Sequence, residues 1–495
     1  MSPSRPRAWH VVAVVACCVV AYWIGIGATG LSMSEGHRVG VAWEWLDEPA
    51  AERDWLVTRL FERVYVRKPQ GVPWALAASS AVFGQTEFAV RAVSAGAATL
   101  LALGVWWFAG RWFGWRRAWV AGCAMALLPW TWESGRAAEI EAVHNLGAGL
   151  ACLGLIDLLV MRRRGLVVGA VAGVGVCVML LAKGPAAGLI VLGAVVGGLV
   201  VARSWRAVFK PGVAIAVALP AAVVGGVGLL TASRLAAIAE RGEPIVAQSP
   251  GAFLWEAGKT LDVLVLLPVT LVMALPAALA LLFPWGPDAS REPDALARRL
   301  AKACAWGVLA SGVLMTIVGV SNPRYMLPVV SMVVVVVGYL AVGASGGFEP
   351  HRARLANAFM LGRPAVMGVV LASAAVWYGQ FFERDQRQSS GRESGLAVAA
   401  AIDANRVAGT AVELWADGMI EARPEVLLYA ERSVGKPIRV RWMRPEDSDV
   451  PLPPAGSFVL MRTDASGDER ARFERVRVVT DGSVHKFEWA LGVVP

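Results

Sequence analysis

The feature that most constrains this chain is a succession of apolar runs, most of them close to the length that crosses a membrane. A transmembrane helix needs about 20 consecutive, mostly apolar residues. We identify about eleven such runs by that criterion, at 10–31, 88–110, 118–133, 140–160, 165–182, 185–202, 212–232, 260–283, 303–320, 326–345 and 364–381. Only 17% of the 495 residues are Asp, Glu, Lys or Arg, against about 25% in a soluble domain. The sequence therefore predicts an α-helical polytopic membrane protein and excludes a soluble enzyme.

Basic residues gather in every second loop between these runs. Lys and Arg number 47 against 38 Asp and Glu, a formal net charge of +9. Membrane proteins concentrate Lys and Arg in their cytoplasmic loops, so we expect a cytoplasmic N-terminus in the inner membrane and, with an odd number of spans, an outer C-terminus. No basic patch interleaved with aromatic residues occurs, and we expect no nucleic-acid partner.

Two hydrophilic stretches fall on the outer side in this topology. The first outer loop, about 32–86, contains an apolar segment at 71–83 that is too short to span and is typical of an interfacial helix. The tail, 383–495, has strand-like stretches at 410–415, 437–443, 457–462 and 475–480 and a short helix at 424–432. The sequence thus predicts a membrane domain, 1–382, followed by a small periplasmic α/β domain, 383–495.

Ionisable residues at the outer ends of the apolar runs are the candidate functional groups. Placing a charged side chain at membrane depth costs about 2.5 kcal/mol or more, so such a residue is taken as a candidate for a functional role. The candidates are Glu35, His37 and Arg38 after the first run, Lys68 before the interfacial segment, Glu133, Arg136, Glu139, Glu141 and His144 around 140, Lys183 at 183–185, and Arg324 with Tyr325. Several have plainer interpretations: Glu35 as a solvated loop acid, Lys68 as a snorkelling lysine, and Arg136 with Glu139 as a structural pair. Together they form a ring of cations beside carboxylates, which favours an anionic lipid phosphate as ligand.

These motifs, in this order, resemble the C-type glycosyltransferases that use polyprenyl-phosphate sugars. The nearest branch comprises the bacterial aminoarabinose transferases and the dolichyl-phosphate-mannose–protein mannosyltransferases. The matching positions run over about residues 10–345: Ser34-Glu35 at the acidic pair of the first outer loop, Lys68-Pro69, Arg136 with Glu141, Lys183-Gly-Pro, and Arg324-Tyr325 with Pro328. The first acid of the family's pair, its usual catalytic Asp, is Ser34 here.

The resemblance implies transfer of a sugar from a polyprenyl-phosphate donor to an acceptor on the periplasmic face, with inversion at the sugar. It implies a GT-C-like fold, and Lys68, Lys183, Arg324 and Tyr325 as ligands of the donor phosphate. Because a serine hydroxyl is no base at neutral pH, the base role passes to Glu35 or Glu141. His37, Arg38, Arg136 and His144 are expected to shape the sugar or acceptor pocket. The acceptor can be a lipid, a protein or a glycan.

Two other functions fit parts of this pattern. A transporter of lipid-linked sugars would line a path to both faces with charges, whereas these charges crowd one side. A non-catalytic lipid-phosphate-sugar binding protein is favoured by Ser34 alone. A divalent metal is a possible cofactor through Glu35, Glu141 and His144, although no spacing such as HExxH occurs.

Overall fold

The structure, a computed structural model, is dominated by long helices. It describes residues 8–61, 63–161, 165–243, 245–247, 292–318, 323–343, 391–406, 412–417, 423–434, 439–443, 453–462, 476–484 and 487–494. Among these residues, six helices are long and apolar enough to cross a membrane. The runs predicted at 260–283 and 364–381, and the predicted domain boundary after residue 382, lie outside the described residues.

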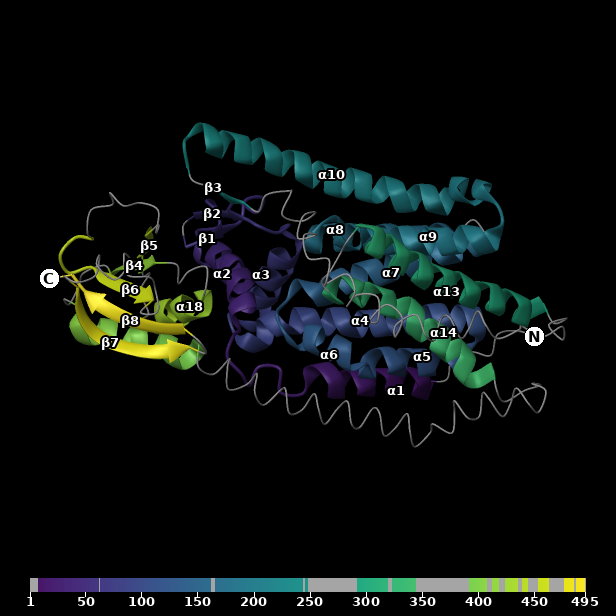
Figure 1. The fold of residues 1–495 in the computed structure, drawn as a ribbon, viewed down its shortest axis with the longest axis horizontal. Helices are drawn as coiled ribbons and strands as arrows, with labels where there is room; N and C mark the ends of the chain where they lie inside the picture. Colours follow the sequence, from purple (N-terminus) through teal and green to yellow (C-terminus); the bar gives the residue numbers. More distant parts are fainter. Residues whose placement is uncertain are drawn as a thin grey trace.

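The helices of the N-terminal part follow the apolar runs. They are α1 (Ala8–Cys18), the π-helix η1 (Val19–Trp23), α2 (Met33–Asp47), α3 (Gly71–Phe83), α4 (Glu87–Phe113), α5 (Trp115–Leu127), α6 (Pro129–Arg136), α7 (Ile140–Val160), α8 (Leu166–Lys183), η2 (Pro185–Ala187), α9 (Gly188–Ala202), η3 (Trp205–Phe209), α10 (Pro211–Glu240), α13 (Glu292–Val318), η4 (Pro323–Val329) and α14 (Val330–Gly343). In Figure 1 the long helices run side by side along one axis, with α10 at the edge of the bundle. Their buried faces form one core rich in Ala, Val and Leu.

Two predicted spans are shorter in the structure than the sequence suggested. The first run, 10–31, is helical only to Trp23, because the chain turns at Gly25, whose φ of 68° favours glycine. The run at 118–133 is divided between α5 and α6. Leu128 between them is extended, as expected of a residue before a proline, and Pro129 starts the new helix.

The helix predicted at 71–83 is confirmed as α3, which begins and ends at the predicted residues. The first outer loop also contains α2 and two short strands, β1 (Arg59–Leu60) and β2 (Arg63–Val66). These strands form a small sheet with β3 (Ile245–Ala247). The loop is therefore an ordered layer at one end of the bundle (Figure 1).

The C-terminal part is a mixed sheet with helices, as predicted. Its strands are β4 (Glu413–Asp417), β5 (Arg439–Met443), β6 (Phe458–Arg462), β7 (Arg477–Val484) and β8 (Phe487–Val493), in the order β5-β4-β6-β8-β7. The last strand, β8, is absent from the sequence-based prediction. The helices are α18 (Pro424–Val434) and a helix over 391–405.

Helix α18 docks the C-terminal domain onto α2. Val426, Leu427 and Leu428 share one buried core with Val39 and Trp43 of α2. The Tyr429 hydroxyl donates to Glu87 Oε1 (2.9 Å) and accepts from the Leu31 backbone N–H (2.8 Å). Figure 1 shows this domain at the end of the bundle where α2 lies, opposite the N-terminus.

Helices α18 and α2 lie close together at Gly36, which leads to a first prediction. A Cβ there would lie 2.9 Å from the Glu425 backbone nitrogen and 3.0 Å from Pro424 Cγ. We expect Gly36→Val to destabilise the docked domain by about 1–3 kcal/mol, the usual effect of overpacking. Hydrogen exchange over 424–434 should become faster. Gly96→Val is the matched control, since a Cβ at Gly96 meets nothing within 4 Å. Unchanged exchange in Gly36→Val would contradict this account of docking.

Candidate active site

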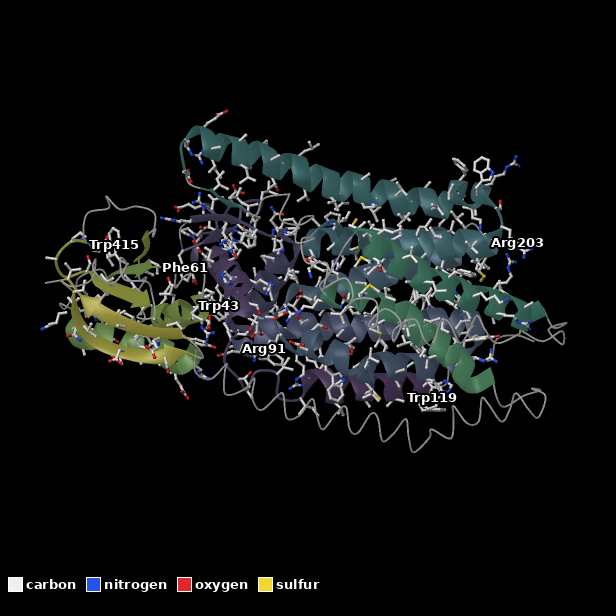
Figure 2. The ribbon with its side chains drawn as sticks, in the orientation of Figure 1. Trp43, Phe61, Arg91, Trp119, Arg203 and Trp415 are labelled. Atoms are coloured by element: carbon white, nitrogen blue, oxygen red, sulfur yellow. The ribbon has the colours of Figure 1, made fainter. Side chains whose placement is uncertain are left out.

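Four segments converge at the end of the bundle that faces the C-terminal domain. They are the start of α2, the loop before α3, the start of α7, and the end of α8 with the neighbouring η4. Figure 2 labels Arg91 in this region and Arg203 at the opposite end. Most of the residues that the sequence singled out come together here.

The centre of the site is an ion pair between α7 and α8. Lys183 Nζ lies 3.0 Å from Glu141 Oε1, and the two side chains are only 7% and 9% exposed. The ammonium also lies 4.5 Å from the centre of the Tyr325 ring in η4, a cation–π contact. The Lys-Gly-Pro and Arg-Tyr motifs, far apart in sequence, therefore meet in space.

A second carboxyl group lies beside this pair. Glu139 precedes α7 as its N-cap residue, and its carboxyl group lies close to that of Glu141. The Ser34 hydroxyl, from α2, donates to Glu139 Oε1 at 2.7 Å. Both glutamates are 7% exposed. Ser34 thus stands next to a carboxyl group that another helix supplies.

Further cations face the carboxyl pair from the outer loop. Lys68, half-buried, is within electrostatic reach of Lys183, Arg38 and Glu141. Burial, with the charges of Lys183 and Arg38, lowers the pKa of Lys68. Arg38 also donates to the backbone carbonyl of Ser34. An anion that approached these side chains would relieve repulsion between neighbouring cations.

Glu35, the first candidate base, has a different environment. Its carboxylate is fully buried and forms a two-point ion pair with Arg91 of α4, at 2.8 Å from Nε to Oε1 and 3.0 Å from Nη2 to Oε2. The backbone N–H groups of Ala138 and Ser32 each donate to it at 2.7 Å. Burial would raise the pKa of Glu35, but Arg91 and these hydrogen bonds outweigh it and lower the pKa to about 2. Both carboxylate oxygens of Glu35 are therefore occupied, and the group joins α2 to α4 in the closed interior.

Of the remaining candidates, some lie at the site and others make contacts that hold the surrounding segments together. His144 is 2% exposed and lies near Lys183 and Glu141, whereas Arg324 in η4 is exposed. His37 stacks on Tyr65 (5.9 Å between ring centres) and contacts the Met33 carbonyl through Nδ1. Arg136 donates to the carbonyls of Ala21 and Ile24, so it ties α6 to the end of the first helix.

The sequence reasoning missed the partner of Glu35. Arg91 lies inside the apolar run 88–110, and a basic residue within a predicted span is itself a signal of a buried partner. No sequence signal indicated that Ser34 and Glu139 would meet. Within the described residues, no group of three or more His, Cys, Asp or Glu side chains could hold a metal ion.

Comparison with known proteins agrees with this architecture. Residues 67–225 match the family model of dolichyl-phosphate-mannose-protein mannosyltransferase. The crystal structure of ArnT from Cupriavidus metallidurans in the apo state is similar with a TM-score of 0.65 at 17% identity, over 98% of both chains. The same protein bound to undecaprenyl phosphate gives a TM-score of 0.64 at 18% identity, again over 98% of both chains. No curated protein sequence matches the chain.

These findings confirm the resemblance and the fold class predicted from the sequence. The matched segment includes Lys68, Glu139, Glu141 and Lys183, which are the residues that converge at the site. The chain is a membrane protein with the fold of ArnT over nearly its whole length, and its residues 67–225 carry the pattern of the dolichyl-phosphate-mannose–protein mannosyltransferases.

Proposed function

We propose that the protein is an integral membrane glycosyltransferase, which moves a hexose or pentose from a polyprenyl-phosphate donor to an acceptor hydroxyl. The observation that carries the proposal is the group of cations, Lys68 and Lys183, beside the carboxyl pair of Glu139 and Glu141, within an ArnT-like fold. The ArnT structure bound to undecaprenyl phosphate supports a polyprenyl phosphate as the class of donor.

The chemistry fits these side chains. As the bond from the sugar to the phosphate breaks, negative charge grows on the phosphate oxygens, and Lys68, Lys183 and Arg324 would stabilise it. The Tyr325 ring holds the Lys183 ammonium through its cation–π contact. The acceptor hydroxyl needs a carboxylate within hydrogen-bond reach. We assign that role to Glu141 and not to Glu35, whose oxygens are all occupied in a buried ion pair.

The orientation in the membrane follows from the charge of the loops. Arg203 and Lys302 lie near each other, and Figure 2 labels Arg203 at the end of the bundle opposite the C-terminal domain. By the positive-inside rule that end is cytoplasmic. The site and the C-terminal domain would then face the periplasm from the inner membrane, where lipid, protein or glycan acceptors are available.

Release of free undecaprenyl phosphate by the purified protein tests the proposal. We expect release from one member of a panel of undecaprenyl-phosphate pentoses and hexoses, incubated with periplasmic acceptors. Lys68→Ala should raise the donor KM by about tenfold, the effect of losing roughly 1.4 kcal/mol of charge-assisted contact. Each assay is run with added divalent cation and with EDTA, which tests directly whether release depends on a metal.

The same assay distinguishes the enzyme from the alternative function, a non-catalytic binding protein. Ser34 favours a protein that binds the lipid phosphate without catalysis. Binding of undecaprenyl phosphate that depends on Lys68, with no release from any donor, would support that function and contradict the enzyme.

A further inference from the structure

Two buried polar atoms on one face of α7 lack a hydrogen bond. Glu141 Oε2 and His144 Nε2 have no hydrogen-bond partner among the described residues, although both atoms are closed to solvent. His144 is the more enclosed of the two residues, at 2% exposure. Because buried polar atoms in native proteins are nearly always paired, each of these atoms marks a place where a ligand or an ordered water binds.

The position of His144 follows from the geometry of the helix. Residues three apart in an α-helix lie on the same face, and His144 is about 4.5 Å further along α7 than Glu141. One turn beyond His144 the helices α7 and α8 are in close contact, since a Cβ at Gly147 would lie 2.4 Å from the Met179 backbone nitrogen. His144 is therefore the deeper of the two polar groups, just before the point where these helices meet.

The ion pair at Glu141 indicates which part of a substrate reaches these atoms. Lys183 Nζ lies 3.0 Å from Glu141 Oε1, and we have assigned Lys183 to the donor phosphate. The anomeric carbon of the donor sugar is bonded to an oxygen of that phosphate, so the sugar ring begins beside this lysine. Glu141 Oε2 is assigned to the acceptor hydroxyl, which leaves His144 Nε2 for the sugar. The ring hydroxyl nearest to the phosphate is the one on C2, the carbon next to the anomeric carbon.

We propose that His144 binds the C2 hydroxyl of the donor sugar and so selects donors that carry this group. This inference rests on the proposed function. A hydroxyl suits Nε2 in either tautomer of a neutral imidazole, because it can both donate and accept a hydrogen bond. As positive charge develops at the anomeric carbon, hydrogen bonds to the C2 hydroxyl become stronger, so the same contact favours transfer. His144 is thus a specificity-determining residue.

Donor binding tests this contact without turnover. The probes are undecaprenyl-phosphate mannose, undecaprenyl-phosphate arabinose and the 2-deoxy counterpart of each. Their binding to the full-length protein is measured in detergent and EDTA, without an acceptor. For at least one of the two sugars, we expect the wild type to bind the 2-deoxy donor about tenfold more weakly, the effect of leaving Nε2 unpaired. His144→Leu should bind the two forms of that donor equally.

Conservative variants identify the atom that makes the contact. The side-chain amide of Gln reaches the position of Nε2, whereas that of Asn reaches the position of Nδ1. His144→Gln should therefore keep most of the preference for the C2 hydroxyl, and His144→Asn should lose it, a difference that a merely structural histidine would not produce. If His144→Leu fails to fold, the comparison of these two variants decides alone. His10→Leu, at a buried histidine of α1, is the matched control and should keep the wild-type preference.

The outcomes separate this inference from the function on which it rests. Equal binding of both forms of each donor by the wild type, or a preference that persists in His144→Leu, would overturn the contact. A preference that appears only with added divalent cation would assign the two unpaired atoms to a metal ion and overturn it as well. A wild type that shows the preference in EDTA but releases no undecaprenyl phosphate with any acceptor would overturn the enzyme and leave the contact standing.

Discussion

Replacing Glu35 with Gln is expected to destabilise the fold by about 3–5 kcal/mol, the range for removing one partner of a buried ion pair. Arg91 would keep its charge with the carboxylate gone. Its guanidinium would retain only neutral acceptors, among them the carbonyls of Ile26, Thr29 and Gly30. The unfolding midpoint in detergent measures the loss. Glu133→Gln is the control for an exposed glutamate.

The double variant Glu35→Met/Arg91→Met gives a sharper test. Removing both charges leaves no uncompensated ion, so we expect it to be more stable than Glu35→Gln. A Glu35→Gln variant that keeps wild-type stability but loses turnover would contradict our assignment and restore Glu35 as a candidate base.

The difference in stability between the wild type and Glu35→Gln should depend on pH, and its sign follows from the pKa of Glu35. The pKa of Glu35 is about 2 in the folded protein against an ordinary 4.5. A depressed carboxyl pKa contributes stability above the unfolded value, and the contribution disappears as the pH falls toward the folded value. The gap between wild type and Glu35→Gln should therefore be constant from about pH 5 to 8 and shrink at lower pH.

Lys183→Met is expected to reduce kcat by about 10²–10³-fold, the usual effect of losing one group that stabilises transition-state charge. The variant removes the cation nearest the carboxyl pair and its contact with the Tyr325 ring. It also leaves the buried Glu141 carboxylate without its ion-pair partner, which favours the protonated form, and a protonated carboxyl group cannot accept the hydroxyl proton. Release of undecaprenyl phosphate, with the donor that the wild type uses, measures the effect.

Lys302→Met is the matched control for this variant. Lys302 lies near Arg298 and Arg203, at the end of the bundle away from the site. Its loss should leave turnover unchanged. Wild-type turnover in folded Lys183→Met would remove Lys183 from the mechanism.

The sequence alone determined the fold class of the protein and pointed to the residues that we propose for its chemistry. Apolar runs of spanning length predict helices because no other open structure satisfies the backbone in lipid, and the buried helices follow those runs. The helix at 71–83 was recognisable as a separate element because its apolar segment is too short to cross a membrane. Lys68, Glu141 and Lys183 stood out because charges at membrane depth are costly without a function.

Only the tertiary structure decided which partner each carboxylate meets. Glu35 and Ser34 are neighbours in α2, yet Glu35 turns to Arg91 on α4 while Ser34 turns to Glu139 at the start of α7. Such pairings depend on how helices far apart in sequence pack, and a helical pattern does not specify the partner that each side chain meets. The packing pairs the charge of Glu35 with Arg91, and it places Glu141 beside Lys183 and Lys68.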